Sequence, residues 1–148
     1  MRNKLVICLG SNFEKEKNMR SAADLLRGYF PSIRFSELAC TEPVGLPLSG
    51  PFLNQMAIAG TDAPVEEVRR AFKEMEASLG RTADSKRKGQ VPIDIDLLRW
   101  NERIVKPADW NKEYVRLLFH SFPDGGDEDE GSEAEPEISG TGNQPVED

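Results

Sequence analysis

The sequence predicts an α+β fold in which helices pack against a single sheet. Residues 5–9 form a short, continuous apolar run of the kind found in buried strands. The segments after this run and after residues 52–59 carry apolar side chains every three or four positions, which is the spacing of an amphipathic helix. Residues 93–97 alternate between apolar and acidic side chains, the two-residue period of a half-buried strand.

The first half of the chain contains two predicted strands with a helix between them. The strand at 5–9 ends at the turn 10–12, and a helical pattern follows over 16–29. Pro31 stops this helix because proline has no N–H to donate. Residues 33–40 are mixed in composition but strand-like. The sequence therefore predicts a strand–helix–strand unit here.

The second half of the chain repeats this pattern. After a strand at 52–59, Thr61 or Asp62 can cap a helix that has Pro64 in its first turn and ends at Gly80. The acidic strand comes next, so the order is β-α-β-β-α-β. That order is typical of a ferredoxin-like sandwich, with a mixed or antiparallel sheet and helices packed on it.

The acidic strand carries the strongest functional signal. Strand alternation places Asp94 and Asp96 on one face, where two like charges repel. A cation between the carboxylates relieves this repulsion, and paired aspartates with open positions suit Mg²⁺ that carries phosphates. Upstream, Arg81 and the basic stretch 86–88 can hold a polyphosphate. The alternative is an exposed edge strand whose polar face happens to carry two aspartates.

The loop over residues 41–51 separates the second and third strands. Its three prolines and two glycines exclude regular structure. Its apolar side chains, Val44, Leu46 and Leu48, favour a loop that folds over a flat, apolar ligand. A plain packing loop is the alternative.

Charge divides the chain into a body and a tail. Residues 123–148 hold ten of the 26 acidic residues and no Lys or Arg, and we expect them to be disordered. Residues 1–122 are mildly basic and long enough for one modest core. Neither a signal peptide nor a membrane-spanning run is apparent, and the two cysteines form no disulfide framework. We expect a cytoplasmic monomer without membrane partners.

Five short motifs, in order across residues 5–104, resemble the 6-hydroxymethyl-7,8-dihydropterin pyrophosphokinase family of folate biosynthesis. The motifs are Leu9-Gly10-Ser11-Asn12, Thr41-Glu42-Pro43-Val44-Gly45, Phe52-Leu53-Asn54, Glu76 with Leu79-Gly80-Arg81, and Pro92-Ile93-Asp94-Ile95-Asp96-Leu97-Leu98. This family transfers pyrophosphate from ATP to the pterin's hydroxymethyl group. The resemblance implies two Mg²⁺ ions held by Asp94 and Asp96, with ATP as the co-substrate.

The resemblance also implies roles for the other matched residues. Phe52 would stack on the pterin ring, and Asn12 would sit near the reacting centre. The remaining pterin contacts would come from Thr41, Pro43, Val44, Gly45 and Asn54. Arg81 would bind phosphate as a catalytic residue of a mobile loop. The nucleotide side would also include Glu76, Lys86, Arg87 and Lys88.

Two departures from the family pattern concern the ATP contacts. Val91 stands where the family has an arginine three residues before the first aspartate. The region after the acidic strand looks shortened, and His120 does not match the family's histidine motif. We interpret His120 as the frayed end of a helix, and Arg116 as a possible substitute for a lost phosphate contact.

Two other functions fit parts of the sequence. A homologue that binds a pterin or nucleotide without turnover is consistent with Val91. RNA-recognition domains share the β-α-β-β-α-β order, but the strand at 52–58 lacks their basic and aromatic pattern. The acidic tail also opposes binding to a nucleic acid backbone. We therefore expect small-molecule partners and no nucleic acid.

Overall fold

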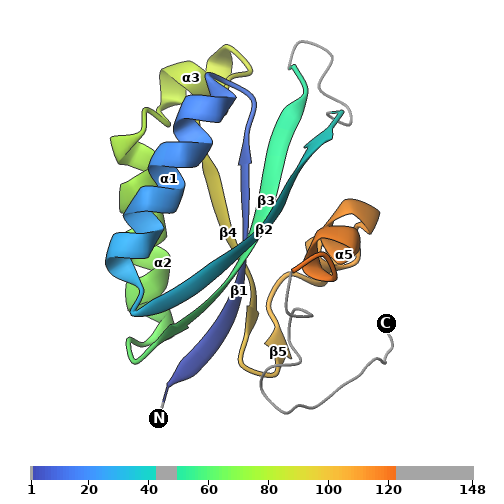
Figure 1. The fold of residues 1–148 in the computed structure, drawn as a ribbon. Helices are drawn as coiled ribbons and strands as arrows, with labels where there is room; N and C mark the ends of the chain where they lie inside the picture. Colours follow the sequence, from blue (N-terminus) through green and yellow to red (C-terminus); the bar gives the residue numbers. More distant parts are fainter. Residues whose placement is uncertain (1, 43–49, 123–148) are drawn as a thin grey trace.

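The computed structural model describes residues 2–42 and 50–122 (Figure 1). Five strands form one sheet in the order β2-β3-β1-β4-β5, and all neighbours in it are antiparallel. The strands are β1 (Asn3–Ser11), β2 (Ser32–Thr41), β3 (Phe52–Thr61), β4 (Asp94–Trp100) and β5 (Arg103–Ile104). The helices are α1 (Lys15–Tyr29), α2 (Val65–Ser78), α3 (Ala83–Arg87), α4 (Pro107–Trp110) and α5 (Glu113–Phe119). The predicted ferredoxin-like α+β sandwich is confirmed, and its sheet is antiparallel throughout.

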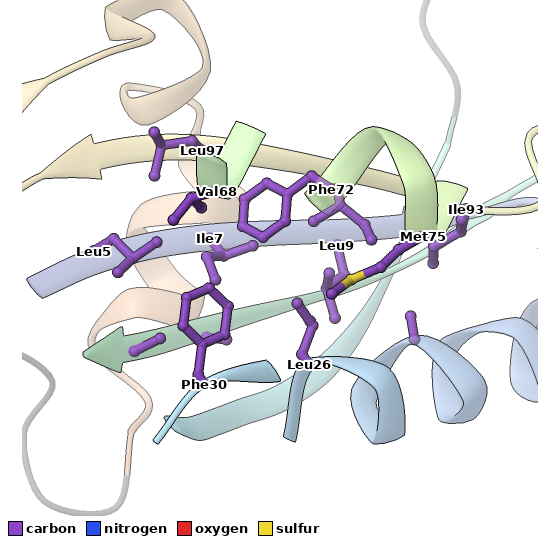
Figure 2. Packing of buried hydrophobic residues seen from close by; sticks show 14 of the residues in the cluster. Leu5, Ile7, Leu9, Leu26, Phe30, Val68, Phe72, Met75, Ile93 and Leu97 are labelled. Carbon is purple, nitrogen blue, oxygen red and sulfur yellow. The ribbon is translucent and has the colours of Figure 1, made fainter. Parts of the chain in front are cut away.

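Helices α1 and α2 lie side by side on one face of the sheet (Figure 1). Alternate residues of β1, namely Leu5, Ile7 and Leu9, point into this layer and are fully buried. Leu26 of α1 and Phe72 of α2 pack against them, as Figure 2 shows. Each such side chain contributes roughly 1.5–3 kcal/mol by leaving water. This cluster is the main core, and it fixes which face of each strand is available for chemistry.

Helix α5 covers part of the opposite face (Figure 1). Val115 and Phe119 of α5 pack on Val6, Met56 and Leu98. These three strand residues point to the face of the sheet opposite the main core. Helix α5 therefore forms a second, smaller core with this face of the sheet.

The start of α2 differs from the prediction. Neither Thr61 nor Asp62 caps this helix, because its N-cap residue is Pro64, and no side chain accepts a hydrogen bond there. Thr61 Oγ1 instead accepts the N–H of Ala63 at 3.1 Å, which makes a turn between β3 and the helix. The end of α2 agrees with the prediction, since Gly80 has a φ of 101°, which favours glycine.

Strand β4 contains one irregularity, a bulge where its pairing with β1 shifts. Ile7 lies opposite Leu97, and Val6 lies opposite Arg99, so one extra residue, Leu98, is accommodated between them. Leu97 faces α1 and α2, while Leu98 faces α5.

Two predictions concern residues that the structure does not describe. The loop residues 43–49 and the acidic segment 123–148 lie outside the described ranges. Within those ranges, no helix combines the length and the apolar character that a membrane crossing requires.

Candidate active site

Phe52, Asn54 and the two aspartates lie on the sheet face that carries α5. Strand β1 pairs with both β3 and β4, so Gly10 lies between Asn54 on one side and Asp94 on the other. One pleat away, Cys8 has Met56 and Asp96 as its two neighbours. The three central strands thus bring the acidic motif and the Phe-Leu-Asn motif to one surface.

Each aspartate of the pair contacts a different cation of the protein. The Nη1 atom of Arg81 lies 2.6 Å from Asp94 Oδ1, and the Nζ atom of Lys106 lies 3.0 Å from Asp96 Oδ1. Burial, followed by the charge of Asp94, raises the pKa of the Asp96 carboxyl above its usual value, and Lys106 opposes that shift. The two positive charges therefore offset the repulsion between the carboxylates.

Arg81 is held in place by two carboxylates and a carbonyl. Its Nη1 donates to Asp94, lies 3.0 Å from Glu76 Oε2, and donates to the carbonyl oxygen of Ile93 at 3.3 Å. Burial by itself lowers the pKa of the Arg81 guanidinium, but the hydrogen bond and charge of Asp94 outweigh it and the net shift is upward. With its side chain 38% exposed, Arg81 can still contact a ligand.

Glu76 lies beneath the site and closes the edge of β4. Glu76 is 4% exposed, and its Oε2 accepts the N–H of Ile95 at 2.8 Å. A buried N–H without a hydrogen-bond partner is costly, and this part of β4 has no neighbouring strand on its outer side to supply one. Glu76 supplies the partner and thereby joins α2 to β4 beside the aspartates. Glu76 therefore orients Arg81 and the strand. Whether it also contacts a nucleotide stays a prediction.

The pterin-side residues that the structure describes form a compact group. Asn54 is buried, and its Nδ2 donates to Thr41 Oγ1 at 2.7 Å. A Cβ atom added at Gly10 would lie 3.2 Å from Asn54 Oδ1 and 3.7 Å from Phe52 Cδ2, so the absence of a side chain at Gly10 allows this close approach. Phe52 is half-buried on the same strand face. The other predicted contacts, Pro43, Val44 and Gly45, lie outside the described residues.

The basic segment after Arg81, expected as part of a mobile loop, contains a short helix. A capping box between Thr82 and Ser85 starts α3. Asp84 of α3 lies 3.0 Å from Arg87 and 3.1 Å from Lys88, whereas Lys86 is exposed. The positive charge of this segment is thus partly neutralised within it.

Asn12 ties the end of the basic segment to the end of β1. Its Oδ1 accepts the N–H of Val91 at 2.6 Å, and its Nδ2 donates to the carbonyl oxygen of Gly89 at 3.0 Å. The backbone N–H of Asn12 donates to the Val91 carbonyl oxygen at 3.0 Å. Asn12 thus positions the segment, and its predicted place near the reacting centre stays a prediction.

Helix α5 contributes packing next to the site. The Arg116 guanidinium carbon lies 5.4 Å from the centre of the Trp110 ring, and the His120 ring packs edge-on against Phe119. His120 is the C-cap residue of α5, as expected for a helix end. Burial, with the charge of Arg116, lowers the pKa of His120.

Sequence reasoning missed Lys106. The only local signal is its place before Pro107, which marks a helix start and says nothing about Asp96. Cys8 packs against the second core and also lies opposite Asp96 on the site face. Burial, followed by the charge of Asp96, raises the pKa of the Cys8 thiol to about 12, so the thiolate is disfavoured.

The donor atoms at the aspartate pair suit a hard cation that also binds phosphate. Asp94 and Asp96 offer carboxylate oxygens, which Mg²⁺ prefers, and Mg²⁺ usually takes only one or two protein carboxylates with its remaining ligands from water and phosphates. Among residues 2–42 and 50–122, no group of three or more His, Cys, Asp or Glu side chains is arranged to hold a metal. The pair therefore fits a metal that arrives with a nucleotide.

Comparison with known proteins agrees with this geometry. Residues 6–121 match the family described as 7,8-dihydro-6-hydroxymethylpterin-pyrophosphokinase. A folate synthesis bifunctional protein of Arabidopsis thaliana is 30% identical over 121 residues, which cover 75% of this chain and 25% of that protein. The chain thus spans about a quarter of this curated relative. Because the family match extends over most of the sequence, the chain belongs to the 7,8-dihydro-6-hydroxymethylpterin-pyrophosphokinase family.

Proposed function

We propose that this chain transfers pyrophosphate from ATP to 6-hydroxymethyl-7,8-dihydropterin, with Mg²⁺ bound at Asp94 and Asp96. The observation that carries the proposal is the placement of Asn54, Gly10 and Asp94 side by side on three paired strands. A pterin seated on Asn54 and Phe52 would present its hydroxymethyl group toward the aspartates. Membership of the family and the folate-pathway relative support the same conclusion.

The proposed pterin site combines a stacking surface with an amide. Phe52 supplies an aromatic face for the planar ring, and Asn54 supplies hydrogen bonds to its polar edge. Thr41 orients the Asn54 amide, because Asn54 Nδ2 donates to the Thr41 hydroxyl. Because Gly10 has no side chain, the side chains of Asn54 and Phe52 can lie close to its backbone.

The proposed phosphate site depends on charge neutralisation. The pterin hydroxyl oxygen would attack the β-phosphorus of ATP, the bond from that phosphorus to the α-phosphate oxygen would break, and AMP would leave. Bound Mg²⁺ would neutralise the charge that develops on the phosphates. Arg81 would bind a phosphate oxygen while Glu76 holds its guanidinium in position. One of the two aspartates would accept the hydroxyl proton.

The test of the proposal is Mg²⁺-dependent release of AMP that requires the pterin. Calorimetric titration with the pterin and with a non-hydrolysable ATP analogue, with and without Mg²⁺, measures each binding step separately. Binding of both ligands without AMP release would instead support the second candidate, a homologue that binds its ligands without turnover. Val91, in place of the family's arginine, is the observation that favours this second candidate.

Replacement of Phe52 or Asn54 tests whether these residues bind the pterin and not the nucleotide. We expect Phe52→Ala and Asn54→Ala each to weaken pterin binding by about 1–3 kcal/mol, through lost stacking or an unpaired amide partner. Nucleotide affinity should stay within about twofold of the parent in both variants. Titration with each ligand measures this.

Leu53→Ala is the matched control, because Leu53 lies between these residues on the strand and packs against the main core on the other face. We expect it to lower stability without a selective loss of pterin affinity. An equal loss of affinity for both ligands in Phe52→Ala would show that Phe52 is a packing residue.

Restoring the family's arginine tests whether the chain is a weakened kinase. We expect Val91→Arg to tighten ATP binding and raise turnover several-fold, because charge-assisted contacts to phosphate are strong. Val91 is half-buried and its backbone N–H is bound to Asn12, so the backbone that would carry the arginine is held in place. Val91→Met controls for side-chain size without charge. An intact fold with no kinetic gain would favour the homologue without turnover, and unfolding would make Val91 a packing residue.

A further inference from the structure

Lys106 brings a second protein cation to the aspartate pair. Its Nζ atom lies 3.0 Å from Asp96 Oδ1, while Arg81 contacts Asp94. The ammonium thus occupies a carboxylate oxygen that Mg²⁺ would also use.

The backbone of Lys106 is anchored on both sides, whereas its ammonium is accessible. The Lys106 N–H and the Val105 N–H both point at the carbonyl oxygen of Leu98, at 3.4 Å and 2.8 Å, and the Trp110 N–H donates to the Lys106 carbonyl oxygen at 2.9 Å. Pro107 follows directly and begins α4. The side chain is 44% exposed. The fold thus fixes the root of this side chain beside Asp96 and leaves its charged end able to move.

A divalent cation would change the surroundings of this ammonium. Without a ligand, the charges of Arg81 and Lys106 balance those of the two aspartates. A metal on Asp96 places two further positive charges near Lys106 Nζ, and like charges at a few ångströms repel even in water. The phosphates of a nucleotide bring the compensating negative charge. An ammonium displaced from Asp96 can then bind phosphate oxygens, and Asp109 is the other carboxylate outside the pair whose charge acts on it.

We propose that Lys106 is a nucleotide-binding residue that exchanges Asp96 for a phosphate oxygen when the metal–nucleotide complex enters. This proposal rests on the proposed function, because it places the metal at Asp94 and Asp96. Its consequence is a coupling between ligands: Lys106 opposes the binding of Mg²⁺ alone and favours the binding of Mg²⁺ together with nucleotide. Metal and nucleotide therefore bind this chain as a pair.

The test is a comparison of two titrations in Lys106→Gln and the parent. With MgCl₂ alone, we expect the variant to bind about three- to tenfold more tightly, because a competing charge has been removed. With Mg²⁺ and a non-hydrolysable ATP analogue, we expect it to bind about five- to tenfold more weakly, because a charge-assisted phosphate contact is lost. Lys106→Arg should keep most of the nucleotide affinity.

Lys112→Gln is the matched control, since Lys112 pairs with Asp109 at 2.9 Å and is similarly exposed. It should leave both affinities unchanged. Tighter binding of both ligands in Lys106→Gln would mean that the lysine only blocks the site, and no change in either would mean an inert surface pair. Weaker binding of both, with a lower melting temperature, would mean a structural role. Each of these results overturns the proposal.

The titrations do not depend on turnover. A parent chain that binds the analogue but releases no AMP contradicts the proposed function and leaves the Lys106 comparison valid.

Discussion

Replacement of either aspartate by asparagine will remove Mg²⁺-dependent nucleotide binding and lower turnover by at least about a hundredfold. In the proposed mechanism each variant loses one of the two carboxylate ligands of Mg²⁺ together with its negative charge, and charge stabilisation of this kind contributes on the order of 10²–10³ in rate. Calorimetric titration of Asp94→Asn and Asp96→Asn with Mg²⁺ and the ATP analogue measures the binding, and AMP release measures the turnover.

The folded state should survive these changes. We expect Asp94→Asn to lose up to about 1 kcal/mol, because its contact with Arg81 is at a partly exposed position. Asp24→Asn is the control, since Asp24 pairs with Arg27 on α1, on the other side of the sheet. A variant of the pair that binds Mg²⁺-nucleotide as tightly as the parent would disprove the metal assignment.

Asp96→Asn should change stability in a pH-dependent way. The folded-state pKa of Asp96 is raised above its ordinary value of 3.8, mainly by burial, so ionisation of Asp96 costs more in the folded protein than in the unfolded chain. The parent therefore loses stability as the pH rises from about 3.8 through the folded pKa, and the asparagine variant does not. Denaturant unfolding at pH 3 and pH 7 measures this. The free energy of unfolding of the variant, relative to that of the parent, should be higher at pH 7 than at pH 3.

Glu76→Ala will be the most destabilising single change in the site. The variant leaves the Ile95 N–H without its partner and takes one carboxylate from Arg81. A buried, unpaired donor costs about 1–3 kcal/mol, and the lost ion pair adds to this. We expect a total loss of about 2–4 kcal/mol and a fall in melting temperature on the order of 10 °C.

Two further variants show which contact matters. Glu76→Gln keeps an oxygen that can accept the Ile95 N–H, so we expect about half of the destabilisation. Glu74→Ala, at an exposed position two residues earlier on α2, should stay within about 0.5 kcal/mol of the parent. If Glu76→Ala instead kept its stability and lost nucleotide affinity, Glu76 would be a ligand contact and the edge-closing hydrogen bond would be unimportant.

The sequence was sufficient for those parts of the site that depend on strand periodicity. The two-residue period places Asp94 and Asp96 on one face, and Phe52 and Asn54 likewise, whatever the register. That β1 lies between β3 and β4, and so joins the two motifs, is known only from the structure. The start of α2 was predicted less well, because Thr61 and Asp62 have good capping side chains, but Pro64, with its fixed φ, takes the N-cap position instead.

The contacts of Glu76 and Lys106 could not be predicted in the same way. Glu76 meets an N–H that is 19 residues away, and only the packing of α2 against β4 decides which helix residue reaches it. Lys106 reaches Asp96 because the chain reverses at Asn101, where φ is 54°, and returns to hydrogen-bond with Leu98. Both contacts depend on how elements that are distant in the sequence pack against each other. The local pattern of apolar and polar residues does not determine this packing.

The bulge in β4 makes the aspartate face tolerant of one deletion and intolerant of others. Leu98 is the extra residue, because Leu97 and Arg99 already lie opposite consecutive residues of β1. A strand without Leu98 would therefore pair regularly and keep Asp94 and Asp96 on the face of the α5 core, at the cost of one buried side chain. Deletion of the residue between the two aspartates would instead place them on opposite faces of the sheet, one of them toward the apolar layer under α1 and α2. Loss of one residue should thus alter only packing at the bulge, but destroy the acidic surface three residues earlier.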